Sequence, residues 1–125
     1  MSAVIRIFLC DDVPELRTLL RYGLEEGDGI EVVGEAGTAE EAIAGVARLA
    51  PDVLLLDLSM PGMDGLEALP LLREASPQTA VIVFSGFAAD RMMEPAMALG
   101  AARYLEKGEP LDVVRRTVVE VAEAA

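Results

Sequence analysis

Short apolar runs alternate along this chain with segments whose apolar residues recur every three or four positions. The short runs are apolar at nearly every position, so strands formed from them must be covered on both faces. That pattern is typical of a parallel sheet between two layers of helices. With right-handed crossovers, five such strands and five helices predict a doubly wound α/β domain. The strands are expected over residues 4–10, 30–36, 53–58, 80–84 and 102–105.

Local signals indicate where the helices begin. Pro14 suits a first turn, residues 38–41 form a capping box, and residues 64–67 begin and end with a capping pair. Asp90 is a candidate cap for the fourth helix, and Pro110 is expected to open the fifth.

The apolar spacing predicts which side of each helix is buried. Pro70 lies inside the third predicted helix, where we expect a kink or a lost hydrogen bond. Gly100 is expected as a C-cap of the fourth helix. The residues expected on the buried faces are Leu16, Leu19, Leu20 and Leu24; Ile43, Val46, Ala47 and Ala50; Leu66, Leu69 and Leu72; and Leu111, Val114, Val118, Val121 and Ala122.

The composition excludes several classes of function. A length of 125 residues fits one domain, residues 1–125. The net charge of -12 argues against direct binding of nucleic acid or of an anionic membrane. Without His there is no Ser-His-Asp or Cys-His catalysis, and the single Cys10 excludes a disulfide framework and is interpreted as a small core residue. No signal peptide or membrane-spanning run is recognisable, so a cytoplasmic setting is expected.

Polar residues stand where four of the predicted strands end. Asp11 and Asp12 follow the first strand, Asp57 lies near the end of the third, Ser85 ends the fourth and Lys107, the only lysine, follows the fifth. In doubly wound folds the ligand site lies at this edge of the sheet. Three neighbouring carboxylates repel one another unless a cation intervenes, and oxygen ligands favour Mg2+. A carboxylate nucleophile, a metal, a lysine and a hydroxyl together suit phosphoryl transfer.

Each of these residues also has a plainer interpretation. Asp12 alone could be a helix N-cap, and Ser85 an ordinary hydroxyl at a strand end. Asp57 is harder to explain in that way, because an unpaired carboxylate after Leu54-Leu55-Leu56 would be costly to bury.

With these residues in this order, the sequence resembles the receiver domains of two-component response regulators. The resemblance covers essentially the whole chain and implies a flavodoxin-like fold with strand order 2-1-3-4-5 and no output domain within residues 1–125. It is carried by Asp11-Asp12, by Asp57 in the run LLLDL, by residues 60–65 (MPGMDG), by Ser85-Gly86 and by residues 104–107 (YLEK).

The resemblance implies a metal and a phosphoacceptor. Asp57 would accept a phosphoryl group from a histidine kinase or a phosphotransfer protein. Asp12 would bind Mg2+ directly and Asp11 through water, while Asp57 and the backbone carbonyl of Ser59 would complete the protein ligands. Apart from slow self-phosphorylation from small donors and self-dephosphorylation, such a domain is not an enzyme.

The resemblance also implies a switch. Lys107 would pair with the phosphoryl oxygens, Ser85 would be the switch hydroxyl, Tyr104 the coupled aromatic, and Gly86 would leave the site open. The surface of the fourth helix, fifth strand and fifth helix would then contact a downstream protein or the protein's own output domain, or form a homodimer on phosphorylation. On that surface, Met92, Met93 and Met97 are either core filler or exposed partner contacts.

One departure from the family concerns the residue after Lys107. The family commonly has Pro there, joined by a cis peptide, and Gly108 stands in its place. A cis bond to a non-proline residue costs about 3–4 kcal/mol, so the state of this peptide is open.

Two other functions remain as alternatives. An aspartyl-phosphate hydrolase of the haloacid-dehalogenase type needs a second Asp two residues after its nucleophile, where this chain has Ser59, and usually carries a cap insertion. A degenerate receiver would act by protein contact alone, but the intact acidic residues, Ser85 and Lys107 argue against it. The cognate kinase, the signal, the output and the oligomeric state are not readable from the sequence.

Overall fold

The apolar runs of the sequence form a parallel sheet, as predicted. The computed structural model describes residues 3–124. The strands pair in the order β2-β1-β3-β4-β5, and every pairing is parallel. The strands are β1 (Ile5–Cys10), β2 (Ile30–Ala36), β3 (Val53–Leu56), β4 (Ala80–Ser85) and β5 (Arg103–Glu106).

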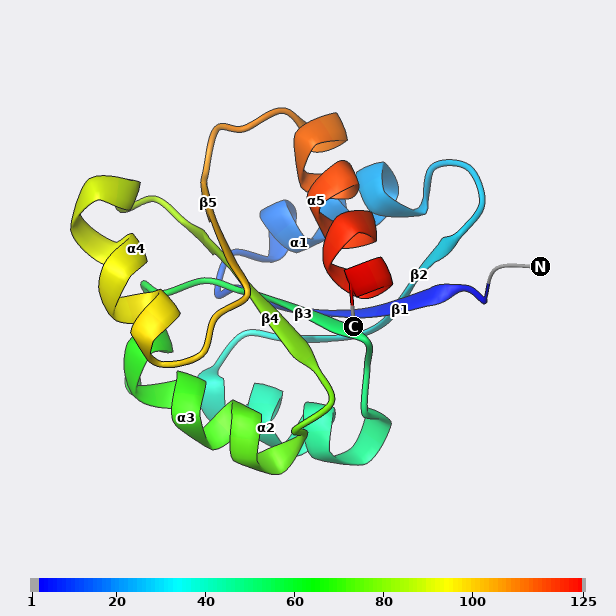
Figure 1. Cartoon of the computed structure of the whole chain (residues 1–125). Helices are drawn as coiled ribbons and strands as arrows, with labels where there is room; N and C mark the ends of the chain where they lie inside the picture. Colours follow the sequence, from blue (N-terminus) through cyan, green and yellow to red (C-terminus); the bar gives the residue numbers. More distant parts are fainter. Residues whose placement is uncertain (1–2, 125) are drawn as a thin grey trace.

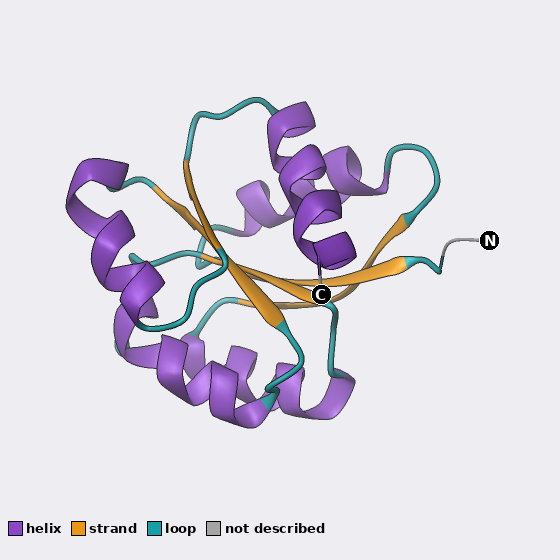
Figure 2. Ribbon diagram, in the orientation of Figure 1, coloured by secondary structure: helices purple, strands orange, loops and turns teal. Residues whose placement is uncertain are grey.

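The helices alternate with the strands and cover both faces of the sheet. Figure 1 shows α1 and α5 on one face and α2 and α3 on the other, with α4 beside β5; the same layers appear in Figure 2. The predicted flavodoxin-like, doubly wound fold and its strand order are therefore confirmed. The helices are α1 (Pro14–Glu25), α2 (Ala39–Leu49), α3 (Gly65–Ala75), α4 (Ala89–Ala98) and α5 (Leu111–Ala124).

The sheet separates two apolar cores. In the central strand β3, Leu54 and Leu56 face the core formed with α2, α3 and α4, whereas Val53 and Leu55 face the core formed with α1 and α5. This alternation follows the two-residue period of a strand. Because both cores are apolar, the strand is apolar at every position.

The strand ends differ slightly from the predictions. β3 ends at Leu56, two residues earlier than expected, and β5 covers 103–106 instead of 102–105. The backbone N–H of Asp57 still donates to the Cys10 carbonyl, at 2.9 Å. A turn begins after Asp57. The Ser59 N–H donates to the Asp57 side chain and not to a neighbouring strand.

Two of the predicted N-caps are confirmed, and the N-cap predicted for the fourth helix is wrong. Thr38 accepts a hydrogen bond from the Glu41 N–H, and Asp64 accepts one from the Glu67 N–H. Asp90 is not the cap of α4, because it lies within the first turn and the cap position is Ala88. The carboxylate of Glu106 in β5 instead accepts from the N–H of Ala89, at 3.3 Å. A tertiary contact has replaced the local cap.

The predicted buried faces hold for most positions. Leu19 is an exception, since it is 54% exposed on the outer side of α1. Ala47 is also exposed, because α2 turns a different face to the sheet. That face carries small residues, which let the helix approach Phe8 of β1; it comprises Ala39, Ala42, Gly45 and Val46.

Both internal prolines are exposed, which explains why their helices tolerate them. α3 continues past Pro70 to Ala75, although Pro70 has no N–H to donate to the preceding turn. α4 likewise contains Pro95. Gly100 follows the C-cap residue Leu99 and has a φ of +107°, a conformation that glycine adopts without strain. Within residues 3–124, no helix is long and apolar enough to cross a bilayer.

Candidate functional site

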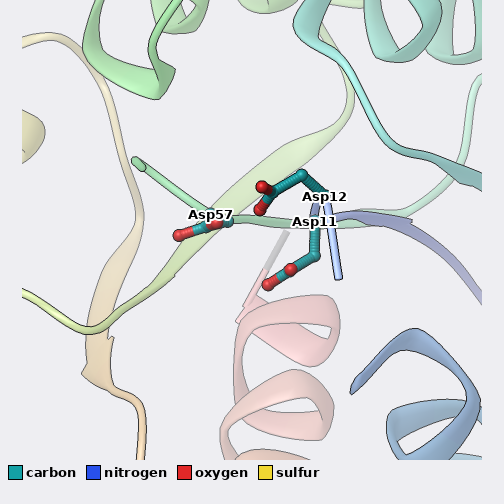
Figure 3. A group of neighbouring side chains, drawn as sticks. All are labelled: Asp11, Asp12 and Asp57. Atoms are coloured by element: carbon teal, nitrogen blue, oxygen red, sulfur yellow. The ribbon is translucent and has the colours of Figure 1, made fainter. Parts of the chain in front are cut away.

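Three carboxylates meet at the carboxyl ends of β1 and β3. Cys10 pairs with Leu56 in the sheet, so the residues that follow these strands lie side by side. One oxygen from each of Asp11, Asp12 and Asp57 lies within 4.8 Å of the others. Figure 3 shows the three side chains extending to the same side of the strand ends. The expected convergence of these acids is therefore present in the structure.

Two of the three carboxylates are buried and hydrogen-bonded. Asp11 is 3% exposed; its Oδ1 accepts from the Val13 N–H at 2.9 Å and its Oδ2 pairs with Lys107 Nζ at 2.8 Å. Asp57 is 2% exposed; its Oδ1 accepts from the Ser59 N–H at 3.1 Å and lies 3.4 Å from Lys107 Nζ. Lys107, which follows the outer strand β5, thus bridges the residues that follow β1 and β3.

Asp12 differs from its two partners because its side chain is exposed. The plainer interpretation of Asp12 as a helix cap does not hold, since the cap residue of α1 is Val13 and it has no side-chain hydrogen bond. Its carboxylate is therefore available to a ligand that enters from solvent.

The ionisation of the site reflects its crowding. Burial raises the pKa of Asp57, and the charge of Asp11 raises it further, against the Ser59 N–H and Lys107, which lower it. Burial alone would lower the pKa of Lys107, but its hydrogen bond to Asp11 and the charge of Asp57 outweigh that and raise the pKa. One ammonium thus pairs with two of the three carboxylates, and a further cation would relieve the repulsion that remains.

The donor set is of the kind that Mg2+ and other hard cations prefer. It consists of carboxylate oxygens, and the chain has no His. Cys10 is the only cysteine in the sequence, but it is buried in β1, and burial together with the charges of Asp57 and Asp11 raises its pKa to about 12. A protonated, buried thiol is a poor metal ligand. Its Sγ lies 3.5 Å from the sulfur of Met60, in keeping with its prediction as a core residue.

Ser85 and Tyr104 are joined through one residue. Ser85 is fully buried, and its Oγ accepts from the Phe87 N–H at 3.1 Å. Tyr104 is half-buried and its hydroxyl donates to the Phe87 carbonyl at 2.8 Å. Phe87 therefore contacts both residues through its backbone, a link that its side-chain type could not have predicted. Gly86, which lies between Ser85 and Phe87 in the sequence, is exposed, and no atom beyond its chain neighbours lies within 4 Å of where a Cβ would be.

Lys107 reaches the carboxylates with a trans peptide after it. Within residues 3–124 no peptide bond is cis, and Gly108 has a φ of +107°. The departure from the family pattern at Gly108 therefore leaves Lys107 in contact with Asp11 and Asp57.

Besides Phe87, sequence reasoning missed Arg17 and Glu35, which lie beside the site. The Arg17 guanidinium donates from Nη1 to the backbone carbonyl of Asp11 and from Nε to Glu35. Arg17 comes five residues after Asp12, and a basic residue one turn into a helix that follows an acidic loop is the signal that could have found it.

The methionines of the α4 region divide between two roles. Met93 and Met97 are 45% and 40% exposed, whereas Met92 packs against the core formed with α2 and α3. Met92 also lines a hollow of about 240 Å³ beside Ser59, Met60 and Phe87. A larger hollow, of about 480 Å³, lies at the opposite edge of the sheet and contains none of the predicted site residues.

The comparisons with known proteins agree on one family. Residues 7–118 match the family described as the response regulator receiver domain. The nitrate/nitrite response regulator protein NarL of Escherichia coli is 43% identical over 110 residues, which is 87% of this chain and 51% of NarL. The transcriptional regulatory protein YhcZ of Bacillus subtilis is 37% identical over 120 residues, 95% of this chain and 56% of YhcZ.

A solved structure extends this likeness to the fold. The signal receiver domain of NarL from Mycobacterium tuberculosis superposes with a TM-score of 0.92 at 29% identity, covering 99% of this chain and all of that domain. The chain spans about half the length of the two curated relatives it matches.

Proposed function

Since this chain belongs to the receiver domains of two-component response regulators, we propose that Asp57 accepts a phosphoryl group in the presence of Mg2+. The donor is a histidine kinase or a phosphotransfer protein. Receiver domains of this family are switches that partner with histidine kinases. The observation that carries the proposal is the buried Asp57 carboxylate, which contacts the Lys107 ammonium and lies beside the carboxylates of Asp11 and Asp12.

The chemistry needs positioning more than acid–base catalysis. An Asp57 oxygen attacks phosphorus, the bond from phosphorus to the donor's imidazole nitrogen breaks, and that nitrogen keeps the electron pair. When bound, Mg2+ neutralises charge on the phosphoryl oxygens and on the carboxylates. Asp12 and Asp57 would hold it directly, Asp11 through water, and the backbone carbonyl of Ser59 would be the remaining protein ligand. Lys107 lies within reach of the same phosphoryl oxygens.

Phosphorylation would change the hydrogen bonds around Ser85. The new phosphoryl group adds negative charge and acceptor oxygens. The Ser85 hydroxyl, which now accepts from Phe87, would donate to a phosphoryl oxygen instead. Because Tyr104 bonds to the same residue, its position would change with that of Ser85.

The altered surface would comprise α4, β5 and α5. Glu106 already joins β5 to the first turn of α4, which couples the strand beside Lys107 to that helix. The exposed Met93 and Met97 suit an adaptable contact on this surface. Its partner would be a downstream protein, the protein's own output domain, or a second copy in a homodimer formed on phosphorylation.

We take residues 1–125 as one receiver domain that acts in the cytoplasm and does not itself bind nucleic acid. Its own chemistry is limited to slow self-phosphorylation from small donors and self-dephosphorylation. A hydrolase of the haloacid-dehalogenase type is disfavoured, because Ser59 stands where that class has its second Asp. A receiver acting by contact alone is disfavoured by the intact set of Asp11, Asp12, Asp57 and Lys107.

The test is phosphorylation by acetyl phosphate, followed by intact-protein mass spectrometry. The protein should gain one phosphoryl group with Mg2+ and none with excess EDTA. Asp57→Asn should gain none, whereas Asp112→Asn, which changes an exposed acid in the first turn of α5, should behave like the wild type.

Two outcomes would contradict the proposal. One is full incorporation in Asp57→Asn, which would place the acceptor elsewhere. The other is no incorporation into the wild type from either acetyl phosphate or a panel of histidine kinases, which would favour the degenerate receiver.

A further inference from the structure

The backbone carbonyl of Asp11 is held by a side chain from the following helix. Nη1 of Arg17 in α1 donates to this carbonyl, and Arg17 is mostly buried, with 19% of its side chain exposed. The Asp11 side chain is tied separately, to the Val13 N–H and to Lys107. Asp11 is therefore held at both its side chain and its carbonyl.

Arg17 is itself held in place by an acidic residue of β2. Its Nε donates to Oε1 of Glu35 at 3.0 Å, and Arg21, one turn later in α1, donates to Oε2 of the same carboxylate at 2.6 and 2.8 Å. Although burial acts to raise the pKa of Glu35, the hydrogen bonds from Arg21 and Arg17 lower it, so the carboxylate stays charged. Glu35 thus fixes the direction of the Arg17 guanidinium.

The peptide that Arg17 holds is the one that joins Asp11 to Asp12. A peptide unit is planar, so fixing its carbonyl oxygen also fixes its N–H and the two Cα atoms on either side. Apolar packing does little for Asp12, because its side chain, Val13 and Pro14 are all exposed. Hydrogen bonds at Asp11 therefore restrain the backbone from which the Asp12 side chain extends.

We propose that Arg17 is a positioning residue of the cation site, which holds the Asp11–Asp12 peptide so that the Asp12 carboxylate faces Asp57. This inference rests on the proposed function, since it assumes that the three carboxylates bind Mg2+. It assigns Arg17 no contact with the cation or with the phosphoryl group.

A positioning role and a simple charge effect predict opposite signs for Mg2+ affinity. Arg17 brings a positive charge close to a cation site, so removing that charge alone would strengthen Mg2+ binding. If Arg17 acts by holding the peptide, removing it would weaken Mg2+ binding despite the gain in negative charge. Losing a partner that orients a metal ligand typically costs about 10-fold or more in affinity.

The experiment measures Mg2+ binding to the whole chain by calorimetry, without a phosphoryl donor. We expect Arg17→Met to raise the dissociation constant about 10-fold. Arg21→Met is the matched control. It also removes one positive charge from α1 and one hydrogen-bond partner from Glu35, but it leaves the bond from Arg17 to the Asp11 carbonyl in place. Its dissociation constant should change by less than roughly 2-fold, as for other exposed ion pairs.

Two further measurements separate positioning from loss of structure. In phosphorylation by acetyl phosphate, Arg17→Met should need more Mg2+ for half-maximal rate, while its rate at saturating Mg2+ stays near that of the wild type. Arg17→Lys keeps a donor for the carbonyl and should recover part of the affinity. Urea denaturation in EDTA establishes that each variant is folded under the conditions of the titration.

The outcomes distinguish this inference from the proposed function. If the wild type binds no Mg2+ and accepts no phosphoryl group, the proposed function fails and the inference fails with it. If the wild type does both, but folded Arg17→Met binds Mg2+ as tightly as Arg21→Met or more tightly, only the inference is overturned.

Discussion

Asp57 carries its carboxylate at a buried position, where a negative charge destabilises the fold. Its carboxylate is buried at the end of the central strand with Asp11 beside it, and only the Ser59 N–H and Lys107 offset the cost. An uncharged side chain of the same shape would suit the folded protein better, but it could not attack phosphorus. The charge is thus explained by the proposed chemistry and not by stability.

The effect of this charge on stability depends on pH in a defined direction. Burial, with the charge of Asp11, raises the pKa of Asp57 above its ordinary value of 3.8. The folded protein therefore loses stability, relative to an uncharged variant, as the pH rises from about 3.8 through the raised pKa. Below the ordinary value the loss is absent.

Asp57→Asn should consequently be more stable than the wild type at neutral pH in EDTA. We expect its free energy of unfolding to be higher by about 0.5–2 kcal/mol, the usual range when a strained functional site is relieved. The gain should shrink as the pH falls towards the ordinary carboxyl range. Urea denaturation at a series of pH values measures it, with Asp112→Asn as the control. A variant less stable than the wild type at neutral pH would mean that Lys107 and Ser59 outweigh the burial.

Most of the site residues could be predicted individually. Asp11, Asp57, Ser85 and Lys107 stand at strand ends that the apolar pattern located, and the topology brings such ends to one edge. Arg17 could not be predicted from the strand ends, because it lies in a helix and bonds to a backbone carbonyl; its place one turn after the acidic pair was the one sequence signal for it. The role of Phe87 was hidden because Phe87 acts through its backbone.

At the scale of elements, the contact of α2 with the sheet depends on the absence of side chains. Phe8 of β1 packs closely against two glycines: a Cβ on Gly45 of α2 would be 2.5 Å from its Cζ, and one on Gly34 of β2 would be 2.6 Å from its Cε2. A side chain at either glycine would therefore collide with the ring. This close approach is why the buried face of α2 consists largely of alanine and glycine.

Gly45→Ala tests this packing. Alanine is the better helix former by about 1 kcal/mol, but overfilling a packed core costs about 1–3 kcal/mol. Because Phe8 is confined by Gly34 as well, we expect the second effect to win and the free energy of unfolding to fall by about 1–2 kcal/mol. Chemical denaturation measures it. The double variant Gly45→Ala with Phe8→Leu should lose less than the sum of the single changes, and a more stable Gly45→Ala would show that the ring can move.

Helix caps supplied by the residue just before the helix were predictable from the sequence, whereas a cap supplied by another element was not. Thr38 and Asp64 cap the helix that each precedes, and short-range spacing identified both. The first turn of α4 receives its acceptor from Glu106, which lies 17 residues away in β5. Only the pairing of β4 with β5 brings that carboxylate to the helix.

At the scale of the whole molecule, the net charge of -12 makes stability sensitive to cations of any kind. Salt screens the general repulsion between surface acids. Binding of one Mg2+ at the three carboxylates would add a specific contribution, which is about 1.4 kcal/mol at ten times the dissociation constant. The two effects can be separated by comparing salts at equal ionic strength.

MgCl2 should therefore raise the melting temperature more than NaCl of equal ionic strength. For a domain of this size, ten times the dissociation constant of Mg2+ corresponds to about 3–6 °C. Asp12→Asn should lose the difference between the two salts while keeping the general response to ionic strength. Differential scanning calorimetry measures both. Equal melting temperatures in the two salts for the wild type would show that the carboxylates bind no Mg2+.

The sequence by itself determined the fold class, the strand order implied by its family likeness and the residues that meet at the sheet edge. Apolar periodicity and strand ends are local properties of the chain, so they located the elements and the site residues, whereas the strand order came from the family likeness. The tertiary structure decided that Lys107 bridges Asp11 and Asp57, that Phe87 joins Ser85 to Tyr104, and that Arg17 holds the Asp11 carbonyl. These contacts depend on the register of distant strands and on backbone atoms, which every residue shares, so the pattern of apolar runs and strand ends does not predict them.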